Sequence, residues 1–334
     1  MPQYQVFLRS AIFDRRLSIH LQVQQLRMSP TRSDTGSRWT SYAILALSVV
    51  IVSSSSILIR FAQADAVPSM AIAAWRMTLA AIVLGGVITF NAQARQQVAA
   101  CSRSDYGLAL AAGGFLALHF ATWITSLSYT SVASSTALVT TNPVWIALAS
   151  WLLFKEKLGA WLVVGIAAAI GGSMLIFLSD LGAGAGQPGS RPLLGNSLAL
   201  MGSLAVCGYL LIGRRLRKTM SLLPYVFLVY SAAALALLVT SLASGIALLG
   251  FSNLAWACLI GLALGPQLLG HSGINWSLKH IPATFIAIAI LGEPVSAALM
   301  AWGILGEGFA RLQLAGFALL LAGIYIASRD RSGS

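Results

Sequence analysis

The chain has 334 residues, of which 57% are hydrophobic and only 9% are charged. A soluble globular domain has about 45–50% apolar and about 25% charged residues, so this composition excludes a soluble protein. The net charge of +12 does not indicate a nucleic-acid partner, because the basic residues lie in a polar tail and in the connections between long apolar runs.

Residues 1–38 form a polar, basic segment without the apolar core of a signal peptide. We expect a disordered cytoplasmic tail, with a short surface-lying helix near residues 7–26. Met28 offers an internal start.

From residue 39 onwards the chain consists of apolar runs of about 20 residues, the length at which a helix spans a bilayer. The runs are continuous and do not alternate with polar residues, which favours helices over a membrane barrel. The sequence therefore predicts an all-α polytopic membrane protein. Its ten transmembrane helices are expected near residues 39–62, 69–90, 105–127, 132–154, 158–178, 193–213, 222–243, 254–276, 281–303 and 311–328.

The basic residues predict the orientation of these spans. Most of the 21 lysines and arginines lie in the tail, at the C-terminus, or after the second, fourth, sixth and eighth spans. With ten spans, all of these positions fall on one side of the membrane. The positive-inside rule then places both termini in the cytoplasm of a cell whose inner (plasma) membrane holds the protein.

Residues 179–192 are rich in glycine and proline, as is typical of a linker. They separate a first repeat, residues 39–178, from a second, residues 193–328, with five spans each. Because five is odd, the second repeat enters the membrane from the opposite side. The two halves are thus predicted to be inverted repeats.

A pattern of the form P-V-x-x-A-L-x-x-W-x-x-x-x-E supports the duplication. It runs from Pro143 to Glu156 and recurs from Pro294 to Glu307, and the same offset pairs Gly165 with Gly316 and Gly172 with Gly323. Glu156 lies between two lysines whereas Glu307 lies between two glycines, as expected if inversion places the second connection outside.

The two prolines lie near the middle of the fourth and ninth predicted spans. Each removes a backbone hydrogen bond, and the freed carbonyl needs a partner or a wet cavity. Matched helix breakers in two hydrophobic halves indicate a transporter's binding site, although a packed kink is the alternative. Asn142 and Glu293 precede Pro143 and Pro294. A carboxylate at this depth is a functional candidate, so Glu293 could bind an amino group, take part in proton coupling, or hold the kink.

Two histidines occupy nearly corresponding positions in the repeats. His119 lies one helical turn before Trp123, and His271 one turn before Asn275, so each pair shares a helix face. We expect these four residues to line the cavity. Trp123, Trp145 and Trp276 could stack on a flat apolar substrate, with anchoring at the membrane interface or packing as the alternatives. We expect no metal site, because no third or fourth ligand accompanies the histidines.

The remaining arginines and cysteines are interpreted as structural, and motifs for catalysis or ATP binding are missing from the sequence. Arg60 and Arg76, the two arginines within spans, are interpreted as structural, although Arg76 could serve a substrate carboxylate. The three cysteines lack metal-ligand spacing. No phosphate-binding loop, dinucleotide fingerprint or nucleophile triad is present, so we expect no cofactor, no enzyme activity and no ATP-driven pumping.

Over residues 40–328 the chain resembles the EamA-type proteins of the drug/metabolite transporter superfamily. The resemblance depends on the five-plus-five organisation, on Ala74-Trp75-Arg76, and on the two proline-to-glutamate segments. It implies a transporter, similar to exporters of amino acids, metabolites or toxic cations, and aromatic amino acid exporters are a possible comparison. Phosphorylated substrates are disfavoured because the spans offer so few basic residues.

The sequence therefore predicts a secondary transporter that exports aromatic or bulky apolar amino acids by alternating access around a midplane cavity. Efflux of organic cations, uptake of a neutral metabolite, and a channel are the alternatives. A membrane-embedded enzyme would need a cluster of catalytic groups at one depth, which the sequence lacks. The expected partners are the lipid bilayer, a small-molecule substrate and a proton gradient, and the chain could be a monomer or a homodimer.

Overall fold

A computed structural model describes residues 35–154, 159–182, 191–277, 280, 286 and 289–329. The chain divides into two units, residues 1–43 and 44–334. Of the first unit, the structure describes only the start of the first helix, and the features below belong to the second. Residues 1–34 of the expected tail, residues 183–190 of the expected linker, and Glu156 lie outside the described residues.

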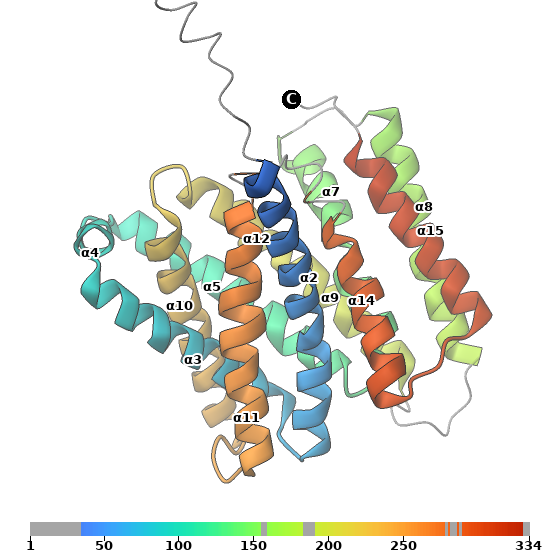
Figure 1. The fold of residues 1–334 in the computed structure, drawn as a ribbon, viewed down its shortest axis with the longest axis horizontal. Helices are drawn as coiled ribbons and strands as arrows, with labels where there is room; N and C mark the ends of the chain where they lie inside the picture. The colour runs from blue at the N-terminus through green and yellow to red at the C-terminus, as the bar shows by residue number, and fades with distance from the viewer. Residues whose placement is uncertain are drawn as a thin grey trace, which may run out of the picture. The chain divides into compact units, whose positions relative to one another are not determined.

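Every regular element in the described part of the chain is a helix (Figure 1). Serine residues define several helix starts: the side chains of Ser102, Ser131 and Ser252 each accept a hydrogen bond from a backbone amide in the first turn that follows. The helices are α2 (Thr35–Ala64), α3 (Ser69–Phe90), α4 (Ala92–Ala99), α5 (Arg103–Ser126), α6 (Val132–Val139), α7 (Asn142–Phe154), α8 (Ala160–Gly182), α9 (Pro192–Leu216), α10 (Leu222–Ala243), α11 (Asn253–Leu262), the π-helix η1 (Ala263–Gly270), α12 (His271–Ser277), α14 (Gly292–Met300), the π-helix η2 (Ala301–Leu305) and α15 (Arg311–Ser328).

Seven helices of the described part are long and apolar enough to cross a membrane. They are Trp39–Ala64, Ser69–Phe90, Arg103–Ser126, Ala160–Leu181, Pro192–Leu216, Leu222–Ala243 and Asn253–Ile274. The expected polytopic all-α class is thereby confirmed in its coarse form.

The other three expected spans differ from simple long helices. The span predicted at 132–154 is interrupted at Thr140–Thr141, between α6 and α7. The span at 281–303 lies partly outside the described residues, and its described end forms α14 and η2. The last span is a shorter apolar helix, Arg311–Ala327. Proline explains the first interruption, since Pro143 has no amide hydrogen with which to continue the α6 ladder.

The span predicted at 254–276 contains an internal irregularity. Pro266 lies inside η1, which joins α11 to α12 in one continuous run. Proline removes an amide from the helical ladder, and the π-helical turn accommodates the missing hydrogen bond. The widened turn lies directly before His271.

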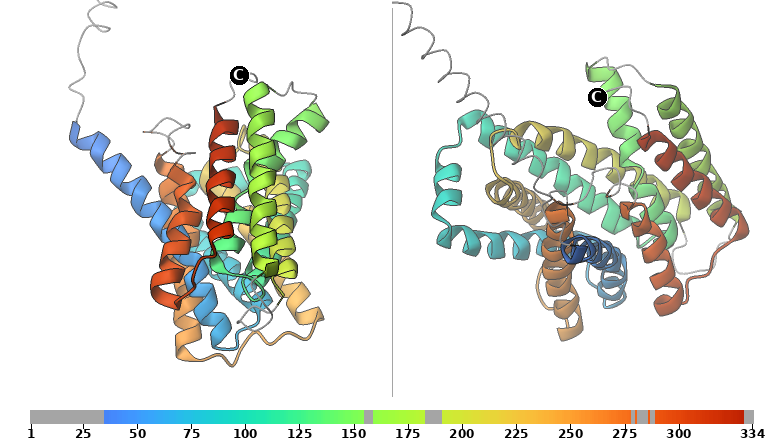
Figure 2. Two further views of the ribbon diagram at one scale, coloured as in Figure 1. Left: turned by 90° about the vertical axis from the view of Figure 1, so that its right-hand side faces the viewer. Right: turned by 45° about the horizontal axis from the view of Figure 1, so that its top comes forward.

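Helices α8 and α15 pack side by side through glycines (Figures 1 and 2). A Cβ atom on Gly165 would lie 2.6 Å from the carbonyl oxygen of Gly323, and one on Gly172 would lie 2.7 Å from that of Gly316. Residue numbers rise along α8 as they fall along α15, so the two helices are antiparallel. Contact this close requires residues without a side chain.

Two further pairs of elements pack in a related way. Along α9, Gly195 faces Ser126 and Thr130 while Gly208 faces Phe115, so α9 is antiparallel to α5. Gly270 and Gly273 likewise lie against residues 48–52 of α2. These contacts bring α2, α5, α9 and the η1–α12 run around a common space.

Candidate functional site

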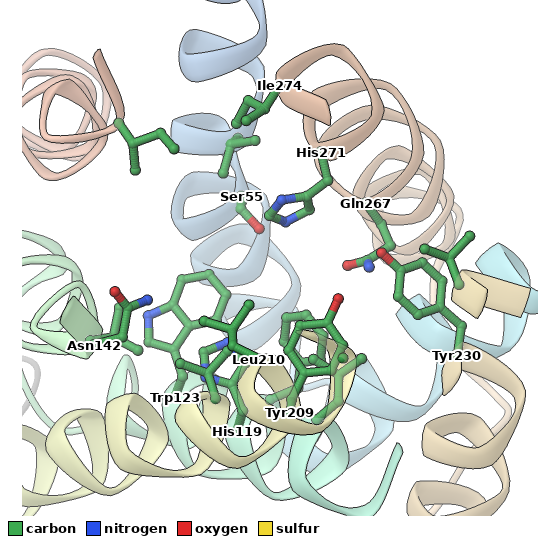
Figure 3. A pocket seen from close by; sticks show the side chains of 18 of the residues that line it. Ser55, His119, Trp123, Asn142, Tyr209, Leu210, Tyr230, Gln267, His271 and Ile274 are labelled. Carbon is green, nitrogen blue, oxygen red and sulfur yellow. The ribbon is translucent and has the colours of Figure 1, made fainter. Parts of the chain in front are cut away.

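A cavity of about 440 Å³ lies among these helices (Figure 3). Its lining comes from α2, α3, α5, α9, α10, the α6–α7 interruption, the η1–α12 run and α14. The polar and aromatic lining residues are Ser55, Arg76, His119, Phe120, Trp123, Thr140, Asn142, Tyr209, Arg214, Arg217, Tyr225, Tyr230, Gln267, His271 and Glu293.

Arg76 is the largest side chain in the described residues to be almost fully buried, with 1% of its surface exposed. Its Nε donates to Gln267 Oε1 at 2.8 Å, and one terminal nitrogen donates to Ser55 Oγ at 2.6 Å. The guanidinium carbon lies 4.4 Å from the centroid of the Phe120 ring, within the range of a cation–π contact. Gln267 reaches this position from η1.

The two histidines both line the cavity. His119 Nδ1 lies 2.9 Å from the carbonyl oxygen of Gly202, where it can donate a hydrogen bond in the matching tautomer. Its ring is stacked on that of Trp123, with centroids 6.0 Å apart and planes 18° apart. His271 begins α12, and Figure 3 shows it projecting into the same space from the opposite helix.

Trp123 faces the cavity with an unsatisfied donor. The residue is 5% exposed, and its Nε1 has no hydrogen-bond partner among the described residues. A buried N–H without an acceptor is costly, so a bound molecule with an acceptor would be favoured there.

Asn142 and Glu293, the residues before the two matched prolines, also line the cavity. Asn142 begins α7 directly after the interruption, and its carbonyl oxygen accepts from Cys207 Sγ at 3.4 Å. Glu293 lies in the first turn of α14, where its carbonyl oxygen accepts from Ser53 Oγ at 3.2 Å.

Four residues predicted for the site do not line this cavity. Pro143 is exposed and Pro294 is buried, and both act on the helix path. Trp145 Nε1 donates to Thr141 Oγ1 at 3.2 Å. Trp276 is 40% exposed and stacks on His280, with ring centroids 4.0 Å apart. Asn275 belongs to α12, but its side chain lies outside the described part of the structure.

Several lining residues were not among the sequence-based candidates. Ser55, Tyr209, Tyr225, Tyr230 and Gln267 come from four different elements. Polar residues inside apolar runs were the available signal, but serines and tyrosines also satisfy backbone groups within helices. Nothing in the spacing distinguishes these roles. Gln267 follows Pro266, and this third proline beside a polar residue within an apolar run was the clearest signal for it.

One end of the helix bundle is held by a cluster of Arg60, Leu127, Val132 and Glu307, here called the Arg60–Glu307 cluster. A terminal nitrogen of Arg60 lies 2.5 Å from Glu307 Oε1, and the other donates to the carbonyl of Leu127 at 2.6 Å. Glu307 Oε2 accepts from the Val132 amide, at the start of α6, at 2.8 Å. The cluster therefore ties α2 to the α5–α6 connection and to the segment before α15.

The cavity reaches the surface at the other end. Arg214 and Arg217 line it and are exposed at the C-terminal end of α9. Because α9 is antiparallel to α5, this end lies away from Leu127, which follows the last residue of α5.

The described residues contain no group of three or more His, Cys, Asp or Glu side chains that could hold a metal ion. The cavity presents the guanidinium groups of Arg76, Arg214 and Arg217, one carboxylate, two imidazoles and aromatic surfaces.

Comparison with known proteins identifies the family of the chain. The EamA-like transporter family matches residues 39–178 and 193–329, which confirms the resemblance inferred from the sequence. An uncharacterised transporter of Bacillus subtilis, YetK, is 27% identical over 202 residues, or 60% of this chain and 61% of that protein. A crystal structure of another protein shares the fold, with a TM-score of 0.60 and 15% identity over 87% of this chain and 96% of that one. The chain is a multi-pass membrane protein that belongs to the EamA-like transporter family.

Proposed function

We propose that the protein is a secondary transporter that exports small amphipathic metabolites, chiefly aromatic or bulky apolar amino acids. The observation that carries this proposal is the cavity of about 440 Å³, which combines an aromatic wall with the carboxylate of Glu293 and two histidines. Ligand sites typically pair apolar walls with a few placed polar groups, and such a lining suits a molecule with one flat apolar end and one polar end.

The helices form ten spans in two inverted five-helix repeats under this proposal. Support comes from the glycines of α8 and α15. The offset that pairs Gly165 with Gly316 and Gly172 with Gly323 also relates their contacts: Gly165 meets Gly323, and Gly172 meets Gly316. Reciprocal contact of this kind is characteristic of a two-fold axis. Antiparallel helices related by such an axis enter the membrane from opposite sides.

Transport proceeds by alternating access, with the Arg60–Glu307 cluster closing one end while the cavity opens between Arg214 and Arg217. The positive-inside rule assigns the exposed arginine end to the cytoplasm of a bacterial-type inner membrane, with both termini on that side. The described arrangement then corresponds to an inward-open state.

Glu293 couples transport to a proton gradient in this scheme. The carboxylate lines the cavity at the matched proline, where taking up or releasing a proton changes its affinity for an amino group. Proton coupling supplies the energy that the absent phosphate-binding loop cannot.

Efflux of organic cations is the second candidate, because Glu293 and the surrounding aromatic rings would also attract a cation. Arg76 opposes it, since a fixed positive charge lines the same cavity.

Counterflow in liposomes tests the proposal. The purified full chain is reconstituted with unlabelled phenylalanine inside and labelled phenylalanine outside, with tetraethylammonium as a parallel substrate. Saturable accumulation of labelled phenylalanine is expected. Accumulation of tetraethylammonium alone would favour cation efflux, and flux that neither saturates nor shows counterflow would identify a channel.

A further inference from the structure

The cavity contains two opposite charges that do not pair with each other. Arg76 and Glu293 both line it, yet the ion pair present among the described residues joins Arg60 to Glu307 instead. Each charge therefore remains available to a group of opposite charge on a molecule bound in the cavity of about 440 Å³.

The partners of Arg76 are neutral. Gln267 and Ser55 accept from two of its nitrogens, and the Phe120 ring covers the guanidinium group. A guanidinium has five N–H donors, so donors remain after these two bonds. Its second terminal nitrogen has no hydrogen bond to another described residue. Since burial of a charge without a counter-ion is costly, the site favours an anionic ligand.

A second unused donor lies close to Arg76. The Trp123 ring centroid is 5.9 Å from the guanidinium carbon, and its buried Nε1 has no partner among the described residues. A carboxylate has two oxygens and accepts several hydrogen bonds, so it could use donors from both residues.

The two charges come from different repeats. Arg76 lies in α3 of the first repeat, while Glu293 lies in α14 and Gln267 in η1 of the second. A ligand that contacts both charges therefore bridges the two repeats. Its binding free energy would depend on how the repeats are arranged, which is the condition for a ligand to shift a conformational equilibrium.

We propose that Arg76, positioned by Gln267 and Ser55, binds the carboxylate of the substrate while Glu293 binds its ammonium group, so that the cavity selects zwitterionic amino acids. This inference rests on the proposed function, and it favours for Arg76 the carboxylate-binding role that the sequence analysis left as the alternative to a structural one.

Inhibition of phenylalanine counterflow by unlabelled competitors tests the substrate selectivity of the intact protein. Labelled phenylalanine is the substrate, and the competitors are phenylalanine, phenethylamine, which lacks the carboxylate, and 3-phenylpropionate, which lacks the amine. We expect phenylalanine to compete at least tenfold better than either analogue. Equal competition by phenethylamine would overturn the assignment of Arg76 while leaving amino acid transport established.

The variants Arg76→Gln and Arg76→Lys separate recognition from folding. Arg76→Gln should weaken phenylalanine competition at least tenfold but leave phenethylamine competition unchanged or improved, because only phenylalanine loses a partner. Arg76→Lys keeps the charge without the planar fork and should give an intermediate loss. Arg215→Gln, which removes an exposed arginine outside the cavity lining, is the matched control and should behave as wild type.

A folded Arg76→Gln protein that still prefers phenylalanine over phenethylamine would overturn the inference. If Arg76→Gln does not fold, the competitor series on wild type and Arg76→Lys decides it, since a merely structural arginine predicts no dependence on the substrate carboxylate. Absence of counterflow of any amino acid by the wild type would overturn the proposed function itself, and the inference with it.

Discussion

Single residues in the cavity show how position within a helix decides role. Trp123 and Trp276 have the same side chain and were both candidates for stacking on a substrate. Trp123 lines the cavity, whereas Trp276 is 40% exposed and stacks on His280. The i, i+4 relation of His119 and Trp123 identifies a shared face, but the direction of that face depends on which helix packs against it.

The two tryptophans allow a matched comparison. We expect Trp123→Phe to weaken the apparent affinity for phenylalanine by about tenfold, because it removes an unsatisfied donor and part of the aromatic wall. Trp276→Phe should leave affinity within about twofold of wild type. Counterflow over a range of substrate concentrations measures both, and equal effects would contradict the placement of Trp123 in the binding site.

Glu293 has a separate consequence for energy coupling. In Glu293→Gln, which cannot exchange a proton, we expect phenylalanine counterflow at saturating substrate to persist without acceleration by a pH gradient. Glu293→Asp retains a carboxylate and should retain the dependence. Acceleration of the glutamine variant equal to that of wild type would exclude Glu293 as the coupling residue.

At the scale of elements, the α8–α15 pair is a close approach between two helices that glycine makes possible. The sequence matched Gly165 with Gly316 and Gly172 with Gly323. It did not reveal that the contacts cross over, so that Gly165 meets Gly323 and Gly172 meets Gly316. That reciprocity follows from antiparallel packing, which only the contacts between Gly165 and Gly323 and between Gly172 and Gly316 display.

Alanine substitutions measure the importance of this contact. A Cβ on Gly172 would lie 2.4 Å from the Leu320 amide nitrogen, a backbone atom that cannot move without separating the helices. We expect Gly172→Ala to destabilise the protein by about 1–3 kcal/mol, as overpacking does, and to lower the melting temperature in detergent. Gly171→Ala is the control, because its Cβ would make an ordinary contact at 3.5 Å with Leu319. Similar melting temperatures for both variants would refute the close packing.

At the scale of the whole bundle, the Arg60–Glu307 cluster is the contact that we propose closes one end of the cavity. Glu307 follows Gly306, whose φ of +70° favours glycine, so the segment that carries the carboxylate turns sharply after η2. Arg60 and the Val132 amide, which are far apart in sequence, both contact the carboxylate of Glu307. Loss of that carboxylate should therefore release the closed end.

Cysteine labelling tests this closure. In a background without native cysteines, a cysteine at Ser55 in the cavity is exposed to an impermeant maleimide added on the side of Arg60. We expect Glu307→Gln to increase labelling several-fold over the parent, because Arg60 and the Val132 amide lose their charged acceptor. Asp65→Asn serves as the control, since Asp65 accepts from Ser252 near the same end of α2 and does not pair with Arg60 among the described contacts. Unchanged labelling in Glu307→Gln would show that the cluster does not restrict access.

The sequence by itself determined the membrane class, the helical architecture, the duplication and the family, because these depend on hydropathy and on local identities that survive without knowledge of contacts. It also indicated His119, Asn142, His271 and Glu293, since polar residues at span centres are costly unless they face a cavity or a partner. Pro143 likewise indicated a disturbed helix, whereas the break at Thr140–Thr141 is seen only in the structure.

Only the tertiary structure decided which residues share the cavity. Arg76 was interpreted as structural because a sequence does not show whether a buried arginine meets a carboxylate or neutral acceptors; its contacts with Gln267 and Ser55 join residues far apart in the chain. Trp276 and Trp145 have the same side chain as Trp123, and only the packing of their helices separates the three roles. The physical reason is that helical periodicity defines faces, whereas the neighbours of each face depend on how the helices of the two repeats pack against one another.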